Sequence, residues 1–313
     1  MKRLLNLLKR KDFAALFWAQ VSGVINDNLI RTALTALIAA HILTLHGQDS
    51  KLVLMIIGLY MLPFFIFSIL AGQIGDKYDK AKVTRIIKFT EIFTVIIAAL
   101  GFYLNSSAIL FCAVFIMGTQ SAFFGPIKYA LMTQILNKTE FIDGNALLES
   151  SRYLAILLGT VTGLTFAAPK FNLTVIFSIM FIFAVAGYLV TRMLAPLTPL
   201  AETLKITPNI FKSTWKNLSR ANQSKKLFLA ILAINWFWVV AAILLSQLNS
   251  VTNSILNLAP EVYTFLIAVF CISVGIGCLA CYRLVKAEIS IKYVPLTTVG
   301  MSLSLLLIAF ILA

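Results

Sequence analysis

The sequence predicts an all-α polytopic membrane protein, and three observations lead to that fold class. Of the 313 residues, 60% are hydrophobic and only 12% are charged, whereas charged residues make up about a quarter of an ordinary soluble domain. The apolar residues form runs long enough to cross a bilayer as helices, which takes about 20 residues. The 26 Lys and Arg residues, which leave a net charge of +14, lie in short clusters between these runs. Because no basic domain with aromatic side chains results, this distribution argues against nucleic acid as a partner.

About nine membrane helices are predicted along the chain. Their ranges are 13–45, 52–75, 84–105, 107–136, 145–168, 172–194, 227–249, 261–283 and 293–313. The basic residues 1–11 resemble the start of a secretory signal, but the run that follows is long and carries Asp27 and Arg31 without a cleavage site. We therefore expect this run to remain as the first membrane helix. The leucines from Leu4 to Leu8 are expected to lie along the membrane surface.

The basic residues also predict how the helices are oriented. When the loops are assigned alternately to the two sides, 21 of the 26 Lys and Arg residues fall on the side of the N-terminus. Lys51 and Lys170 fall on the other side, and three more lie within helices. Loops rich in Lys and Arg remain in the cytoplasm. The N-terminus is therefore predicted to be cytoplasmic.

One long polar loop divides the chain. Residues 195–226 form a basic linker after the sixth helix, so we predict a six-helix bundle over 1–194 and a partial second bundle over 227–313. Transporters with this plan are built from three-helix units, in two halves of six helices. Nine helices make three such units. We therefore expect a fourth unit to be missing and the chain to be truncated at its C-terminus.

The loop between the second and third helices contains a short motif. Its sequence is Gly72-Gln-Ile-Gly-Asp76-Lys77-Tyr-Asp79-Lys80-Ala-Lys82. Gly72 permits close helix packing, and an acid such as Asp76 can join neighbouring helix ends in one conformation and release them in another. The lysines supply a basic turn. Candidate gating residues are Gly72, Asp76, Lys77, Lys80 and Lys82.

This loop resembles the signature loop of the major facilitator superfamily. Its glycine, acid and basic residues agree with that loop, whereas Asp79 stands in place of a glycine and Ala81 in place of a basic residue. The resemblance implies two helix bundles that work by alternating access.

Charged residues inside predicted membrane helices are costly and indicate functional sites. Asp27, Arg31 and Thr35 lie on one face of the first helix at steps of four, with Gln20 two turns earlier, and near the middle of the membrane. Asp27, Asn28 and Arg31 are therefore candidates for substrate binding. Alternatively, Asp27 and Arg31 are a self-neutralising ion pair with a structural role.

A second group of charges is predicted at the cytoplasmic ends of the fourth and fifth helices. Lys128 follows Pro126 there, and Glu149 and Arg152 share a helix face at a similar depth. We expect Lys128, Glu149 and Arg152 to contact substrate or form a gating pair, although Lys128 could reach the cytoplasm instead and all three could stabilise packing. Glu91 is expected to pair locally with Lys88.

Several strings resemble the bacterial lysophospholipid transporter family within this superfamily, and the related transporter domain fused to acyltransferase and acyl-carrier-protein ligase modules. They are Asn26-Asp27-Asn28, the loop 71–82, Gln120-Ser-Ala-Phe-Phe-Gly-Pro-Ile-Lys-Tyr129, Gly144-Asn-Ala-Leu-Leu-Glu149 and Ala155-Ile-Leu-Leu-Gly-Thr160. The resemblance implies movement of lysophospholipids across the bacterial inner membrane, a role for Asp27 in transport, Gln120 as a further site residue, and an acyltransferase system as partner.

Two other functions stay open. One is ion-coupled transport of a soluble metabolite or drug, and the other is a non-transporting remnant or membrane anchor for a lipid acyltransferase system. No nucleophile, phosphate loop or cofactor motif points to an enzyme or a cofactor. Cys278 and Cys281 form a C-x-x-C without the further ligands that a metal site needs, because the two histidines lie at the other end of the chain.

Overall fold

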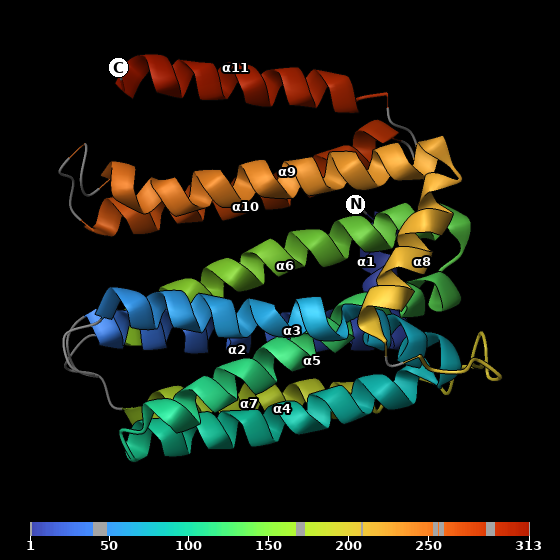
Figure 1. Ribbon diagram of the computed structural model, residues 1–313, viewed down its shortest axis with the longest axis horizontal. Coiled ribbons are helices and arrows are strands. Elements are labelled where there is room, and N and C mark those ends of the chain that lie inside the picture. Colours follow the sequence, from blue (N-terminus) through green and yellow to red (C-terminus); the bar gives the residue numbers. More distant parts are fainter. Residues whose placement is uncertain are drawn as a thin grey trace.

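The computed structural model describes residues 2–39, 49–166, 173–207, 209–252, 256, 260–285 and 292–312. His41 and His46 lie outside these ranges. Every regular element of the described residues is a helix (Figure 1), as predicted. The helices are α1 (Lys2–Lys9), α2 (Lys11–Ala39), α3 (Asp49–Lys77), α4 (Lys80–Tyr103), α5 (Ser107–Ile135), α6 (Lys138–Phe166), α7 (Leu173–Thr191), α8 (Ile210–Asn222), α9 (Lys225–Ser250), α10 (Pro260–Val285) and α11 (Val294–Leu312).

Six of these helices contain segments long and apolar enough to cross a membrane, judged by length and composition. They lie in α3, α4, α5, α7, α9 and α10, and a shorter apolar helix covers Val294–Phe310. Helices α2 and α6 are long enough but carry several charged side chains. The predicted number of about nine membrane helices therefore stays a prediction.

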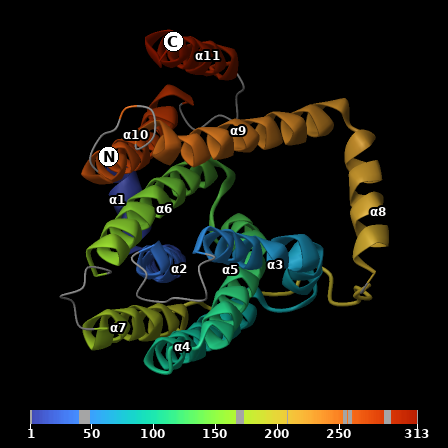
Figure 2. The same cartoon turned by 60° about the vertical axis from the view of Figure 1, so that its left-hand side comes forward.

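Helices α2 to α7 pack into one bundle. Helix α2 packs against α3, α6 and α7, α5 packs against α3 and α4, and α4 packs against α7. Figure 2 shows α2 between α6 and α7. Helix α10 packs on the side of α6, and α11 lies farthest from the bundle (Figure 2). Apolar side chains such as Leu34, Val114 and Met180 fill the centre of the bundle.

Close contact between α2 and α6 depends on two glycines one turn apart. A Cβ atom at Gly159 would lie 2.6 Å from the carbonyl oxygen of Ile25, and one at Gly163 would lie 2.8 Å from that of Leu29. Small residues four positions apart let two membrane helices approach until their backbones touch. The string Ala155–Thr160 therefore belongs to a packing surface that holds the polar face of α2 in place.

The N-terminal helix α1 packs against α2 and α6. Leu4 and Leu7 are buried, so the prediction that these leucines lie along the membrane surface is wrong for both, whereas Leu5 is exposed. Arg3 pairs with Asp143 at 3.0 Å and Arg10 with Glu140 at 2.9 Å.

Glu140 lies in the first turn of α6, ahead of the predicted membrane segment 145–168. The backbone N–H of Asn137 donates to its carboxylate at 3.1 Å. This bond, followed by the bond from Arg10, holds the pKa of Glu140 below its ordinary value. Glu140 therefore stays charged and able to hold Arg10, which keeps α1 on the bundle.

The linker contains a helix that the sequence analysis did not predict. Helix α8 crosses one end of the bundle, transverse to the long helices (Figure 1), and packs against α3 and α9. Asn209 caps its N-terminus, since its side-chain oxygen accepts the N–H of Lys212 at 2.9 Å. The preceding segment runs along the α3–α4 loop, where the backbone N–H groups of Leu200 and Ala201 donate to the carbonyl of Asp76.

Candidate functional site

A cluster of polar side chains lies inside the six-helix bundle, where α2 meets α3, α4 and α5. We call it the central cluster, and its members are Asn26, Asp27, Tyr60, Lys88, Glu91, Gln120 and Ser121. Asp27 accepts two hydrogen bonds at Oδ2, from the Ser121 hydroxyl at 2.5 Å and the Tyr60 hydroxyl at 3.0 Å. Hydrogen bonds to a charged acceptor are among the stronger ones. Helices α3 and α5 therefore both hold this carboxylate.

Asp27 and Arg31 are both described, yet they form no ion pair. Instead the Arg31 guanidinium carbon lies 4.5 Å from the centre of the Tyr60 ring. A cation over an aromatic face is attracted by the negative face of the ring. The alternative of a direct Asp27–Arg31 ion pair is therefore wrong, because Tyr60 contacts each of them through a different part of its side chain.

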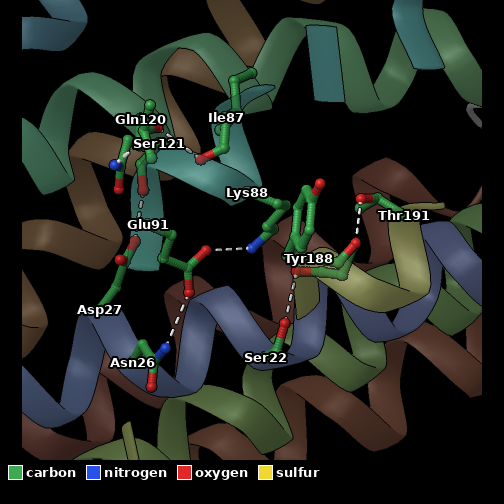
Figure 3. A network of polar contacts seen from close by, with 12 residues as sticks. Ser22, Asn26, Asp27, Ile87, Lys88, Glu91, Gln120, Ser121, Tyr188 and Thr191 are labelled. Carbon is green, nitrogen blue, oxygen red and sulfur yellow. Dashed lines mark hydrogen bonds and ion pairs between the residues drawn. The ribbon is translucent and has the colours of Figure 1, made fainter. Parts of the chain in front are cut away.

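A buried ion pair forms the other side of the central cluster (Figure 3). Lys88 Nζ lies 2.7 Å from Glu91 Oε2, and Asn26 Nδ2 donates to Glu91 Oε1 at 2.9 Å. The predicted local pairing of Lys88 and Glu91 is confirmed. The pair is buried, however, and belongs to the site because Glu91 faces the same space as Asp27 (Figure 3).

A small cavity lies between these groups. Its volume is about 40 Å³, and it is lined by Asp27, Lys88, Glu91, Gln120 and Ser121 among others. A water molecule occupies about 30 Å³ of liquid, whereas sites for small organic ligands measure about 300–1,000 Å³. In this conformation the cavity has room for a water molecule or a small ion, and a lipid head group needs the helices to separate.

A larger apolar groove lies on the other side of Gln120. It measures about 480 Å³, and its walls include Ile74, Val83, Ile86, Ile87 and Phe123. Lys82 and Tyr78 line it toward the α3–α4 loop, and Thr90, Thr119 and Gln120 add polar atoms. Gln120 donates its amide to Thr94 at 2.7 Å and to Thr90 at 3.1 Å. Gln120 and Ile87 line both the groove and the small cavity.

The second predicted group of charges also comes together, where α5 and α6 meet α2. We call it the α5–α6 cluster, and its members are Gln20, Lys128, Tyr129, Glu149 and Arg152. Glu149 pairs with Lys128 and with Arg152, each at 3.1 Å, and accepts the Tyr129 hydroxyl at 2.8 Å. The proximity of the three charges is confirmed. Lys128 is buried, so the alternative that it reaches the cytoplasm is wrong here.

Gln20 joins the two clusters. Its carbonyl oxygen accepts Lys128 Nζ at 2.8 Å, and its amide donates to the backbone carbonyl of Leu148 at 2.7 Å. Gln20 also lines the small cavity beside Asp27. Because it contacts Lys128 and lines this cavity, Gln20 lies between the two clusters.

Asn28 is a predicted binding residue that belongs to neither cluster, whereas Arg31, also outside the two clusters, contacts Tyr60 of the central cluster. Its amide donates to the carbonyl of Val24 at 2.8 Å within its own helix, and a Cβ at Gly159 would lie 2.9 Å from the Asn28 Cβ. Asn28 therefore faces α6, because a rotation of 100° per residue separates it from Asp27.

Comparison with known proteins bears on this arrangement. The sequence matches the Major Facilitator Superfamily model over residues 16–313, which is nearly the whole chain. The chain belongs to the major facilitator superfamily. Its members include membrane transporters, so the chain is placed among transporters rather than among enzymes.

Two relatives within the superfamily are both named lysophospholipid transporter LplT. The lysophospholipid transporter LplT of Enterobacter sp. strain 638 is 24% identical over 293 residues, which cover 91% of this chain and 69% of that protein. The protein of the same name from Escherichia coli O1:K1 is 27% identical over 153 residues, 49% of this chain and 36% of that protein. Among solved structures, the human organic anion transporter MFSD10 shares the fold, with a TM-score of 0.64 at 13% identity, over 90% of this chain and 72% of that one.

The signature loop of the superfamily differs from two of the expectations for it. A Cβ at Gly72 would meet nothing within 4 Å, so the prediction of close packing at Gly72 is wrong. Lys80 is fully buried at the start of α4 and is not part of an exposed basic turn, whereas Lys82 is exposed. Lys77 is half-buried, with its ammonium 5.8 Å from the centre of the Tyr78 ring.

Asp79, rather than Asp76, is the acid of this loop whose carboxylate forms hydrogen bonds. Asp79 Oδ1 accepts the backbone N–H of Ala81 at 2.9 Å, which caps α4, and that of Leu197 in the linker at 3.1 Å. The Asp76 carboxylate is exposed and forms no hydrogen bond or ion pair with the described residues. In this member of the superfamily the acid at the usual glycine position therefore joins the loop to the linker.

Several residues of the site could not be predicted from the sequence. Tyr60, Ser121 and Tyr129 are uncharged and lie in apolar or mixed strings, so no charge pattern marks them. Trp238 of α9 lies beside the α5–α6 cluster. It is partly exposed, and the Arg152 guanidinium carbon lies 5.4 Å from the centre of its indole.

Proposed function

We propose that the chain serves in the transport of lysophospholipids across the bacterial inner membrane by alternating access of two helix bundles. In this proposal Asp27 and Arg31 act at a central site, Lys128, Glu149 and Arg152 on the cytoplasmic side, and Gly72, Asp76, Lys77, Lys80 and Lys82 belong to the gate. The two relatives named lysophospholipid transporters support the substrate.

The chemistry of the clusters suits a lysophospholipid. Its phosphate needs a cation, and Lys128 and Arg152 share a single carboxylate, Glu149, so the group of three keeps one net positive charge. A phosphate can replace Glu149 as the partner of either cation. The acyl chain needs only an apolar surface, which the groove beside Phe123 offers.

One observation supports lysophospholipid transport more than it supports the other candidate functions. Gln120 and Ile87 form a common wall between the apolar groove and the polar cavity beside Asp27. An amphipathic molecule needs apolar and polar surfaces next to each other, whereas a soluble metabolite has no use for the first. Separation of α4 and α5 at this wall would join the two spaces.

The test is uptake of labelled lysophosphatidylethanolamine into spheroplasts that express the chain, compared with Asp27→Asn. We expect uptake by the unchanged chain and its loss in the variant. Glu202→Gln, an exposed acid of the linker, is the matched control and should transport normally. Absence of uptake by folded protein in the membrane would refute the proposal for this chain.

Ion-coupled transport of a soluble metabolite or drug is the second candidate, and the size of the cavity favours it. The cavity of about 40 Å³ lies between the carboxylates of Asp27 and Glu91, which suits a small cation or a proton-carrying water. Uptake that depends on a proton or sodium gradient, without competition by lysophospholipid, would support this candidate instead.

The remaining assignments extend the proposal. We place the N-terminus in the cytoplasm because of the distribution of Lys and Arg, and we divide the chain at 195–226 into a six-helix bundle and a second group of helices. An acyltransferase and acyl-carrier-protein ligase system would use the lysophospholipid on that side. Cysteine labelling at position 6, where Asn6 is exposed, tests the orientation, and co-purification tests the partner.

A further inference from the structure

Helix α8 carries a basic surface that the proposed transport does not use. Lys212, Lys216 and Arg220 follow one another at steps of four, which places them on one side of the helix, and all three are exposed. The sequence contains no Asp or Glu from residue 203 to residue 260. This side of α8 therefore has no acidic neighbours along the chain that could neutralise it.

Apolar side chains lie beside the basic ones. Trp215 is 74% exposed and Leu218 is 45% exposed, and their spacing of three places them together on the helix surface. Ser213 and Ala221 are buried and mark the side that faces the protein. Trp215 and the three cations thus lie on surface that the described residues leave uncovered.

The position of α8 suits a membrane surface. It lies across one end of the bundle, transverse to the long helices (Figure 1), and at a steep angle to α9 (Figure 2). The last part of α3 holds it there: Gln73 Nε2 lies 3.5 Å from Ser213 Oγ, and Gln73 Oε1 accepts the backbone N–H of Thr207 at 2.8 Å. A helix that is transverse to membrane-spanning helices at their ends lies in the plane of the head groups.

We propose that α8 binds the head groups of anionic phospholipids in the leaflet on its own side of the membrane. Charge complementarity selects this occupant, since three exposed cations in a stretch of chain without Asp or Glu attract anionic lipids, an attraction that adds for each Lys or Arg near the surface. Trp and Leu beside them enter the boundary between head groups and acyl chains, where indole side chains are favoured. This binding is separate from transport and does not depend on the substrate.

The test measures contact between Trp215 and lipid in the full chain. Trp18→Phe, Trp236→Phe and Trp238→Phe together leave Trp215 as the single tryptophan, and the protein is reconstituted into vesicles of phosphatidylethanolamine and phosphatidylglycerol. Bromine is placed on the acyl chains of one lipid or the other at equal mole fraction. We expect brominated phosphatidylglycerol to quench Trp215 about two-fold more than brominated phosphatidylethanolamine, because the cations enrich the anionic lipid.

Two charge variants test whether the basic residues of α8 cause the extra quenching by brominated phosphatidylglycerol. This extra quenching should disappear in the triple variant Lys212→Gln/Lys216→Gln/Arg220→Gln. The matched control, Lys9→Gln, Lys11→Gln and Lys138→Gln, removes three exposed lysines elsewhere and should retain it. Equal quenching by the two lipids, or an equal loss of the extra quenching in both variants, would overturn the proposal. All six residues are exposed, so folding is not expected to change.

Discussion

The Arg31 guanidinium lies 4.5 Å from the centre of the Tyr60 ring. The hydroxyl of the same tyrosine donates to Asp27 at 3.0 Å. The acid and the base on the polar face of α2 are therefore held by one residue of α3, and a movement of α3 relative to α2 changes the surroundings of both charges together. Tyr60 is the residue through which this connection is best examined.

Tyr60→Phe should lower transport while leaving the ring in place. The variant keeps the aromatic face under Arg31 but removes one of two donors to Asp27, and a hydrogen bond to a charged group contributes about 1.5–3 kcal/mol. We expect uptake of labelled lysophosphatidylethanolamine to fall about tenfold, the effect of roughly 1.4 kcal/mol. Tyr103→Phe, at an exposed tyrosine of α4, is the control. Normal uptake by Tyr60→Phe would show that the hydroxyl has no part in the site.

Lys88→Met should destabilise the protein, because it leaves Glu91 buried without its cation. Removal of one partner of a buried ion pair costs about 3–5 kcal/mol, whereas replacement of both partners is often nearly neutral. We expect a lower unfolding midpoint for Lys88→Met in detergent and recovery of most of the loss in Lys88→Met/Glu91→Gln, where the amide can still accept the bond from Asn26. Lys82→Met, at an exposed lysine, should unfold like the unchanged protein. Equal midpoints for the single and double variants would contradict this account.

Gly163→Val should disrupt the contact between α2 and α6. A Cβ at this position would lie 2.8 Å from the Leu29 carbonyl oxygen, and overpacking of this kind costs about 1–3 kcal/mol or more. The matched control is Gly277→Val in α10, where a Cβ meets nothing within 4 Å. Thermal unfolding followed by size-exclusion chromatography should show a lower midpoint for Gly163→Val alone. Similar midpoints for the two variants would argue against tight α2–α6 packing.

Much of the fold could be predicted from hydropathy. Predicted segments such as 107–136 and 84–105 agree closely with α5 (Ser107–Ile135) and α4 (Lys80–Tyr103), because long apolar runs dominate both signals. Helix α8 was missed because it is polar, short and amphipathic, so a search for apolar runs passes over it.

Charge marks most of the candidate-site residues that could be predicted, and Gln120 came from the family resemblance. Asp27, Lys128, Glu149 and Arg152 could be found because ionisable residues are rare inside membrane helices. Asn28 was included as a polar residue of the first helix and of the string Asn26-Asp27-Asn28, although it faces another helix. The contacts of Tyr60 and Ser121 with Asp27 depend on how α3 and α5 pack against α2, which spacing within one helix does not define.

Asp79→Ala should loosen the linker, and Asp76→Ala should not. Asp79 caps α4, a contribution of about 1 kcal/mol, and its carboxylate also accepts the N–H of Leu197. The linker contacts of Asp76 use its backbone carbonyl, which alanine retains. We expect trypsin to cleave after Lys205 faster in Asp79→Ala than in the unchanged protein. Mass spectrometry of the fragments measures the rate of this cleavage. Faster cleavage in Asp76→Ala than in Asp79→Ala would show that the carboxylate of Asp76 holds the linker instead.

The bonds from Asp79, Asp76 and Gln73 have a mechanical consequence for the molecule. They attach the linker to the first bundle as far as Ser213, so most of its length cannot act as a flexible tether. Helix α8 is about 20 Å long at 1.5 Å per residue. Its first turn is attached to this bundle, and the rest of the helix extends from it. Only Gln223 and Ser224 connect α8 to α9, so a rotation of α9 relative to α8 has to be accommodated in these two residues.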